Sequence, residues 1–165
     1  MNVNEMRGKT CCFTGHREIP QQDRKIVSEN LEKTVADLIA KGYLYFGAGG
    51  AYGFDTLAAQ TVLKLKKKHR DIKLILVLPC PSQTKRWSAE AVKEYERIKA
   101  QADKVVYTSQ EYTKDCFHKR NRHLVDYSSV CVCYLTKDGG GTDYTVGYAR
   151  LKGLDVINLA PGRKV

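Results

Sequence analysis

Six apolar residues lead directly into a glycine-rich turn in the sequence Val130-Cys-Val-Cys-Tyr-Leu-Thr-Lys-Asp-Gly-Gly-Gly141-Thr142. The apolar run predicts a buried strand over residues 130–135, because a strand covered on both faces is apolar throughout. A helical pattern follows over residues 143–152 and stops at Gly153. A strand, a turn and a helix in direct succession are typical of an α/β protein with a parallel sheet.

The same alternation extends through the rest of the chain. Further strands are predicted at residues 9–13, 43–46, 73–78, 104–107 and 156–159. Helical spacing predicts helices at residues 23–41, through 57–65, at 89–101 and at 118–127. We therefore expect one domain over residues 1–165, a Rossmann-like α/β three-layer sandwich with a mainly parallel sheet of about six strands.

Composition favours a soluble globular domain. Hydrophobic residues make up 42% of the chain and charged residues 28%. No apolar run approaches the ~20 residues that cross a bilayer, and residues 1–9 are too polar for a signal peptide. We therefore expect a cytoplasmic protein that does not associate with membranes.

The six cysteines lack the spacing of metal or redox sites, because no Cys-x-x-Cys occurs. Cys131 and Cys133 lie two residues apart in an apolar run, so both are predicted to point to one buried face of a strand. We expect no disulfide framework, no structural metal and no bound cofactor.

The turn at Gly139, Gly140, Gly141 and Thr142 is a candidate anion site. It joins a strand to a helix, where backbone N–H groups lack intrahelical partners and glycine lets a phosphate approach closely. A merely flexible turn is the alternative. The strand–turn–helix context favours the anion-binding interpretation.

A second glycine-rich loop, Gly47-Ala-Gly49-Gly50-Ala-Tyr-Gly53-Phe-Asp55, follows the second predicted strand. It resembles a dinucleotide fingerprint, but that fingerprint normally follows the first strand and needs a ribose-binding acid further on. A nicotinamide or flavin dehydrogenase is therefore not favoured. Asp55 has two open interpretations, a residue that complements the helix dipole or a functional residue that accepts ribose hydroxyls or acts as a base.

The formal charge of +10 favours anionic partners. Thr14-Gly15-His16-Arg17 follows the first strand, and Arg120 and Asn121 begin a later helix, where a cation is electrostatically unfavourable unless it binds an anion. Trp87 has two open interpretations, stacking on a base or ordinary packing. Loops that leave parallel strands at their carboxyl ends should converge on one edge of the sheet.

These segments resemble the YpsA-like family of the SLOG superfamily, which also includes the DprA/Smf proteins and the LONELY GUY phosphoribohydrolases. The resemblance rests on Cys12-Phe-Thr-Gly-His-Arg17, Gly49-Gly-Ala-Tyr-Gly-Phe-Asp55, Lys119-Arg-Asn121 and Gly140-Gly-Thr142 with Tyr148-Ala149, and covers nearly the whole chain. It implies a Rossmann-like fold that binds nucleotides or nucleotide-derived ligands.

One departure concerns catalysis. The LONELY GUY enzymes carry a Pro-Gly-Gly-x-Gly-Thr-x-x-Glu motif, and here Thr145 stands at the position of its glutamate. A threonine supplies no carboxylate for cleavage of a glycosidic bond, so the resemblance implies such an activity only if Asp55 or Asp143 substitutes.

The leading expectation is a domain that binds or senses a nucleotide or nucleotide-derived small molecule. A nucleoside monophosphate N-glycosidase, with Asp55 as the candidate catalytic residue, is the alternative. Single-stranded nucleic acid is less favoured, and the sequence leaves a homodimer open. The candidate ligand-binding residues are Thr14, Gly15, His16, Arg17, Gly49, Gly50, Gly53, Asp55, Arg120, Asn121, Gly139, Gly140, Gly141 and Thr142. We expect Arg120→Ala to weaken ligand binding and to leave the fold intact.

Overall fold

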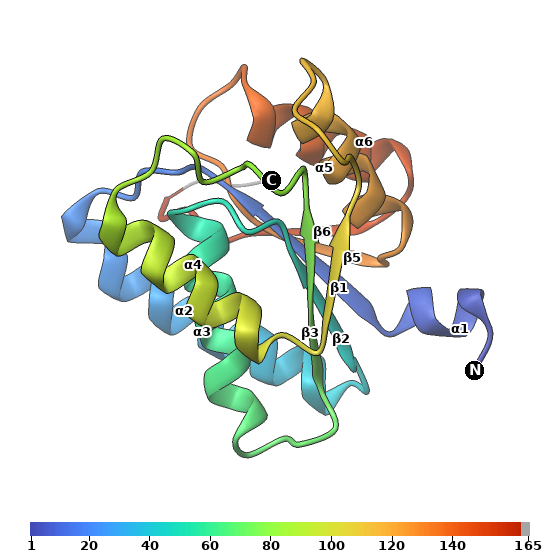
Figure 1. Ribbon diagram of the computed structural model, residues 1–165. Helices are drawn as coiled ribbons and strands as arrows, with labels where there is room; N and C mark the ends of the chain where they lie inside the picture. Colours follow the sequence, from blue (N-terminus) through green and yellow to red (C-terminus); the bar gives the residue numbers. More distant parts are fainter. Residues whose placement is uncertain (163–165) are drawn as a thin grey trace.

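Six parallel strands form one sheet in the computed structural model, which describes residues 1–162 (Figure 1). The strands lie in the order β4-β3-β2-β1-β5-β6, and every neighbouring pair is parallel. Their bounds are β1 Thr10–Gly15, β2 Tyr45–Ala48, β3 Lys73–Leu78, β4 Lys104–Tyr107, β5 Val130–Tyr134 and β6 Asp155–Asn158. The predicted sheet is confirmed.

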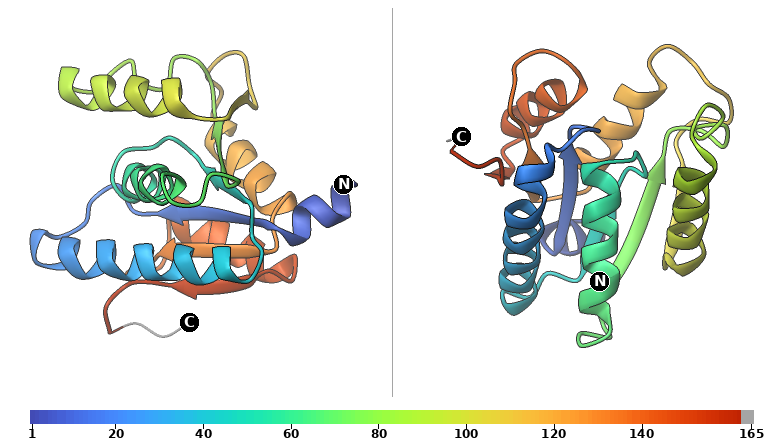
Figure 2. Two further views of the ribbon diagram at one scale, coloured as in Figure 1. Left: turned by 90° about the horizontal axis from the view of Figure 1, so that it is seen from below. Right: turned by 90° about the vertical axis from the view of Figure 1, so that its left-hand side faces the viewer.

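Helices cover both faces of this sheet, as the two views of Figure 2 show. The helices are α1 Val3–Gly8, α2 Gln21–Ala40, α3 Phe54–Lys66, α4 Ala89–Gln101, α5 Cys116–Asp126 and α6 Gly141–Leu151. Buried side chains of α2, α3 and α4 form one apolar cluster with the sheet, and those of α5 and α6 form a second. The two clusters confirm the three-layer α/β sandwich.

The buried residues follow the patterns seen in the sequence. In α2 the apolar residues Val27, Leu31, Val35 and Leu38 are all buried, because their spacing places them on one helical face. All five residues of β5 are buried. All six cysteines are free and buried, and Cys131 and Cys133 lie together in the second cluster, as their spacing predicted.

Strand β2, predicted at residues 43–46, instead spans Tyr45–Ala48, and two further elements differ from the sequence prediction. The short helix α1 was not expected, since its residues are all exposed and none packs into the core; a capping box between Asn2 and Glu5 stabilises it locally. Strand β1 runs to Gly15 rather than ending at residue 13, because Thr14 and Gly15 pair with β5. Thr14 and Gly15 therefore belong to the strand end rather than to a loop.

The strand order places a topological switch point between β1 and β5. From β1 the chain adds β2, β3 and β4 on one side, and then crosses to add β5 and β6 on the other. The connections that leave β1 and β5 therefore diverge, and a crevice is expected between them at the carboxyl edge of the sheet. None of the helices within residues 1–162 is long and apolar enough to cross a membrane.

Candidate functional site

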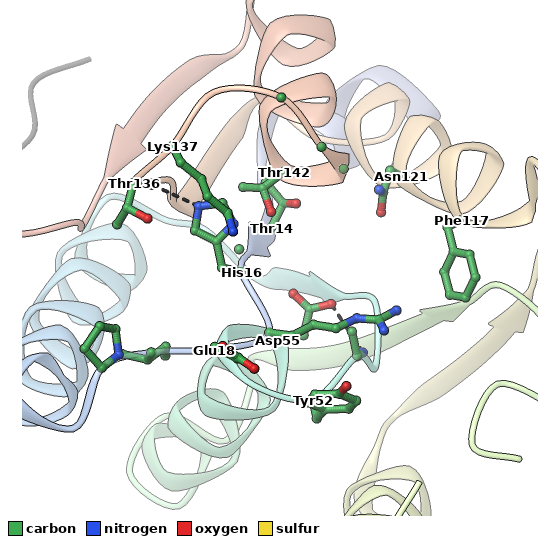
Figure 3. A pocket seen from close by; sticks show the side chains of 18 of the residues that line it. Thr14, His16, Glu18, Tyr52, Asp55, Phe117, Asn121, Thr136, Lys137 and Thr142 are labelled. Carbon is green, nitrogen blue, oxygen red and sulfur yellow. Dashed lines mark hydrogen bonds between the residues drawn. The ribbon is translucent and has the colours of Figure 1, made fainter. Parts of the chain in front are cut away.

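A cavity of about 1020 Å³ opens at this switch point (Figure 3). Eleven of the fourteen residues predicted from the sequence line it, so most of the predicted segments do converge. The eleven are Thr14, Gly15, His16, Arg17, Asp55, Arg120, Asn121, Gly139, Gly140, Gly141 and Thr142. The rest of the lining includes Glu18, Arg24, Tyr52, Phe117, Thr136 and Lys137.

The other three glycines, Gly49, Gly50 and Gly53, do not line the cavity. Their backbones approach other groups too closely for a side chain. A Cβ atom on Gly49 would lie 2.6 Å from the Arg120 guanidinium, and one on Gly53 would lie 2.1 Å from the Arg17 carbonyl oxygen. These three glycines therefore allow close packing around the cavity and do not form part of its lining.

One end of the cavity is formed by the start of α6. Gly139 and Gly140 have φ values of +76° and +107°, which glycine adopts without strain. Gly140 is the N-cap of α6, and no side chain within residues 1–162 caps that helix. A Cβ on Gly141 would meet no atom within 4 Å. The first backbone amides of α6 are therefore sterically open, and the positive end of the helix dipole lies behind them.

His16 ties two of the converging segments together. Its Nε2 atom accepts a hydrogen bond of 2.9 Å from the Thr136 backbone N–H, drawn as a dashed line in Figure 3. Its ring also contacts the edge of Tyr134, with ring centroids 5.8 Å apart. The loop after β1 and the loop after β5 are thereby held in one arrangement.

Asp55 lies at the base of the cavity and is only 6% exposed. One carboxylate oxygen accepts a hydrogen bond of 3.3 Å from the Ala51 N–H. Burial raises the pKa of Asp55 from 3.8 to about 6, although Arg120, the Ala51 N–H and Arg17 all act to lower it. The sequence left two interpretations open, and this setting suits a group that exchanges a proton near neutral pH.

Arg120 is buried beneath the same cavity, with 4% of its surface exposed. Its guanidinium donates hydrogen bonds to the Gly49 carbonyl oxygen and to Oδ1 of Asn121. Burial lowers the pKa of Arg120, while Asp55 acts to raise it. An alanine here would leave the Gly49 carbonyl without that donor and Asp55 without its nearby cation. The expectation that Arg120→Ala leaves the fold intact is therefore revised.

Aromatic side chains form the other end of the cavity. The Arg17 guanidinium carbon lies 5.3 Å from the ring centroid of Tyr52 and 5.7 Å from that of Phe117. Trp87 packs edge-on against Tyr52, with ring centroids 5.1 Å apart, and does not line the cavity itself. Sequence reasoning singled out neither Tyr52 nor Phe117. The signal for Tyr52 was its place inside the second glycine-rich loop.

The basic segment at residues 119–123 divides between two sites. Arg120 and Asn121 line the main cavity. Lys119, Arg122 and His123 instead line a second cavity of about 440 Å³ beside the end of β4. Helical spacing separates them, since neighbouring residues on a helix point about 100° apart.

Thr145 lies outside the main cavity and is almost fully buried. Its hydroxyl donates a 2.8 Å hydrogen bond to the Gly141 carbonyl oxygen, one turn earlier in α6. The only carboxylates that line the cavity are therefore those of Asp55 and Glu18, within residues 1–162. Asp143 accepts a hydrogen bond from the Gly139 N–H and does not line the cavity.

Comparison with known proteins shows relatives along most of the chain. The uncharacterized SPbeta prophage-derived protein YoqJ of Bacillus subtilis is 31% identical over 137 residues, which cover 75% of this chain and 80% of YoqJ. The UPF0398 protein YpsA of the same organism is 24% identical over 151 residues, covering 86% of this chain and 84% of YpsA.

A solved structure shares the fold. DNA processing protein A from Helicobacter pylori superposes with a TM-score of 0.65 at 19% sequence identity. The match covers 93% of this chain and 66% of that protein. The sequence profile of the YpsA SLOG family matches residues 11–153, which include every predicted site residue. The chain therefore belongs to the YpsA SLOG family.

Proposed function

We propose that this protein binds a phosphate-bearing, nucleotide-derived small molecule in the cavity between β1 and β5. The observation that supports this most directly is that segments far apart in the sequence converge on one cavity. Segments that follow β1, β2 and β5, together with the first turns of α5, contribute to one cavity at the switch point of the sheet. Ligands of open α/β sheets bind at this position.

The start of α6 is the proposed phosphate-binding end. The backbone amides at Gly141 and Thr142 lie in the first turn of the helix, where no intrahelical acceptor exists. The Thr142 hydroxyl and the Lys137 side chain line the cavity next to them. Figure 3 shows Lys137, Thr142, Thr14 and His16 gathered on this side. Amides, a hydroxyl and a cation suit the oxygens of a phosphate group.

Substitution of Gly141 tests the phosphate-binding end. Gly141→Val places a branched side chain over the open amides, and we expect at least a tenfold loss of affinity for adenosine 5′-monophosphate by isothermal titration calorimetry. Gly147→Val is the matched control, because Gly147 lies in the same helix and also has no atom within 4 Å of a Cβ position. Thermal unfolding of both variants reports their folding.

Two results would contradict the proposal. The first is the absence of binding heat from the wild-type protein with any nucleotide of a broad panel. The second is equal affinity of the wild-type and Gly141→Val proteins for a nucleotide that does bind.

The position and pKa of Asp55 favour a second candidate function, N-glycosidic cleavage of a nucleoside monophosphate. Its carboxyl group lines the cavity and has a pKa of about 6, within the range of a general acid or base at neutral pH. Release of free base by the wild-type protein, lost in Asp55→Asn, would support this activity. No turnover of any nucleoside monophosphate would exclude it.

Single-stranded nucleic acid remains the less favoured ligand class. The structure from Helicobacter pylori was described for its single-stranded DNA binding mode, and this chain carries a net charge of +10. Such binding should weaken steeply with added salt, because it releases counterions from the phosphates. An affinity for oligonucleotides that does not change with ionic strength would exclude this alternative.

A further inference from the structure

The cavity has two chemically different ends. Residues 139–142 with Lys137 form the α6 end, and Tyr52, Phe117 and Arg17 form what we call the aromatic end. In Figure 3, Tyr52 and Phe117 lie away from Lys137 and Thr142, and Asp55 lies between Thr142 and Tyr52. A ligand that fills both ends must itself carry two different groups.

At the aromatic end, one guanidinium group lies close to two aromatic rings. Arg17 lies within cation–π distance of both Tyr52 and Phe117, at 5.3 Å and 5.7 Å from their centroids. Both rings therefore turn π surface toward the space that the guanidinium occupies. Guanidinium planes and aromatic rings are the groups on which proteins stack nucleobases.

Both rings already contact other side chains of the protein, although Tyr52 is 39% exposed. The Tyr52 ring meets Trp87 edge-on, and Trp87 meets the buried Tyr95 edge-on, with centroids 5.4 Å apart. Phe117 is the second residue of α5, and the Arg120 guanidinium carbon lies 5.7 Å from its centroid. Contacts of this kind reduce the conformational freedom that the rings lose when a ligand stacks on them.

From this geometry we infer that Tyr52 and Phe117 bind the nucleobase of the ligand, with Arg17 stacking against it. The inference rests on the proposed function and specifies the ligand class as a nucleoside phosphate rather than a sugar phosphate. The phosphate lies at the α6 end, the base lies at the aromatic end, and the sugar spans the cavity near Asp55.

Two probes and four proteins test this assignment. Adenosine 5′-monophosphate carries both groups, whereas ribose 5-phosphate lacks the base. The wild-type protein is compared with Tyr52→Ala, with Tyr52→Phe, which keeps the ring, and with Tyr127→Ala, a control at an exposed tyrosine outside the main cavity. Isothermal titration gives each affinity, and thermal unfolding shows that each variant is folded.

We expect the wild-type protein to bind the nucleotide about tenfold more tightly than the sugar phosphate, since stacking a base on an aromatic ring contributes about that factor. Tyr52→Ala should lose this advantage and leave ribose 5-phosphate affinity unchanged, while Tyr52→Phe and Tyr127→Ala should retain it. Trp87, the only tryptophan, contacts Tyr52, so its fluorescence should change with the nucleotide and not with the sugar phosphate.

Failure of the proposed function and failure of this inference give different results. If the wild-type protein binds neither probe nor any other nucleotide, the proposed function fails and this inference fails with it. If it binds both probes equally, and Tyr52→Ala changes neither affinity, phosphate binding stands and the base assignment is wrong. If Tyr52→Ala weakens both probes by the same factor, Tyr52 shapes the cavity and binds no base, which also overturns the inference.

Discussion

At the scale of single residues, the charge balance below the cavity depends on Asp55 and Arg120. Both side chains are buried, and no salt bridge within 4.0 Å joins them among residues 1–162. Each nevertheless shifts the pKa of the other, so the two charges interact at longer range. The buried arginine is the largest of three influences that keep the pKa of Asp55 from rising further, the others being the Ala51 N–H and Arg17.

The shifted pKa predicts how stability depends on pH. The folded-state pKa of Asp55 is about 6 and its ordinary value is 3.8, so between these values the folded protein keeps a proton that the unfolded chain has lost. The free energy of unfolding should therefore decrease as pH rises through this window, by up to about 3 kcal/mol. Asp55→Asn should flatten this part of the profile.

Urea unfolding of the wild-type and Asp55→Asn proteins at several pH values measures this effect. Asp71→Asn, at an exposed carboxylate, is the matched control. If the wild-type and Asp55→Asn profiles run parallel across the window, Asp55 titrates at the same pH in the folded and unfolded chains.

At the scale of elements, the site depends on how β1 and α3 meet. Gly53 precedes α3 with a φ of +84°, and the Phe54 N–H donates to the His16 carbonyl oxygen. A Cβ on Gly53 would lie 2.1 Å from the Arg17 carbonyl oxygen. This junction thus places Asp55, in the first turn of α3, next to the segment that carries His16 and Arg17.

Two alanine substitutions separate backbone strain from steric clash. Gly42 also has a positive φ, +98°, but a Cβ there would meet no atom within 4 Å. Gly42→Ala should therefore lower the free energy of unfolding by about 1 kcal/mol, from the left-handed conformation alone. Gly53→Ala should cost more than about 2 kcal/mol, because it adds the clash. Equal losses in urea unfolding would contradict the close approach at Gly53.

At the scale of the whole molecule, charge is the dominant surface property. The chain carries a net charge of +10, and four salt bridges join charged side chains within residues 1–162. Two of these join lysines in the last turn of α3 to other segments, Lys64 to Glu32 of α2 and Lys66 to Asp103 after α4. The remaining excess of positive charge repels itself in the compact state.

Salt should therefore stabilise the protein. Raising the NaCl concentration from about 20 mM to about 200 mM shortens the screening length to below 10 Å, and we expect the urea midpoint to rise. Sodium chloride and potassium chloride should act alike, because the effect is screening and not specific binding. A midpoint that falls with added salt would mean that the ion pairs outweigh the repulsion.

Much of the fold could be predicted from local sequence. Apolar runs located all six strands, and helical spacing located α2 to α6, because burial on one or both faces imposes those periods on the residues themselves. Helix α1 escaped prediction, because only the Asn2–Glu5 capping box marks it. The extension of β1 also escaped, because pairing with β5 and not residue type sets its length.

The candidate site also has one part that could be predicted from the sequence and another part that only the folded structure reveals. Glycines, a histidine and arginines next to strand ends could be recognised in the sequence, because an anion site built from accessible backbone amides and cations requires those residue types. Whether a given glycine faces the cavity, as Gly141 does, or packs against Arg120, as Gly49 does, depends on what other segments bring near it. The aromatic end likewise joins Tyr52 to Phe117 across 65 residues of chain. Local chemistry follows from the order of residues, whereas proximity between distant residues arises only when the strands pair and the helices pack.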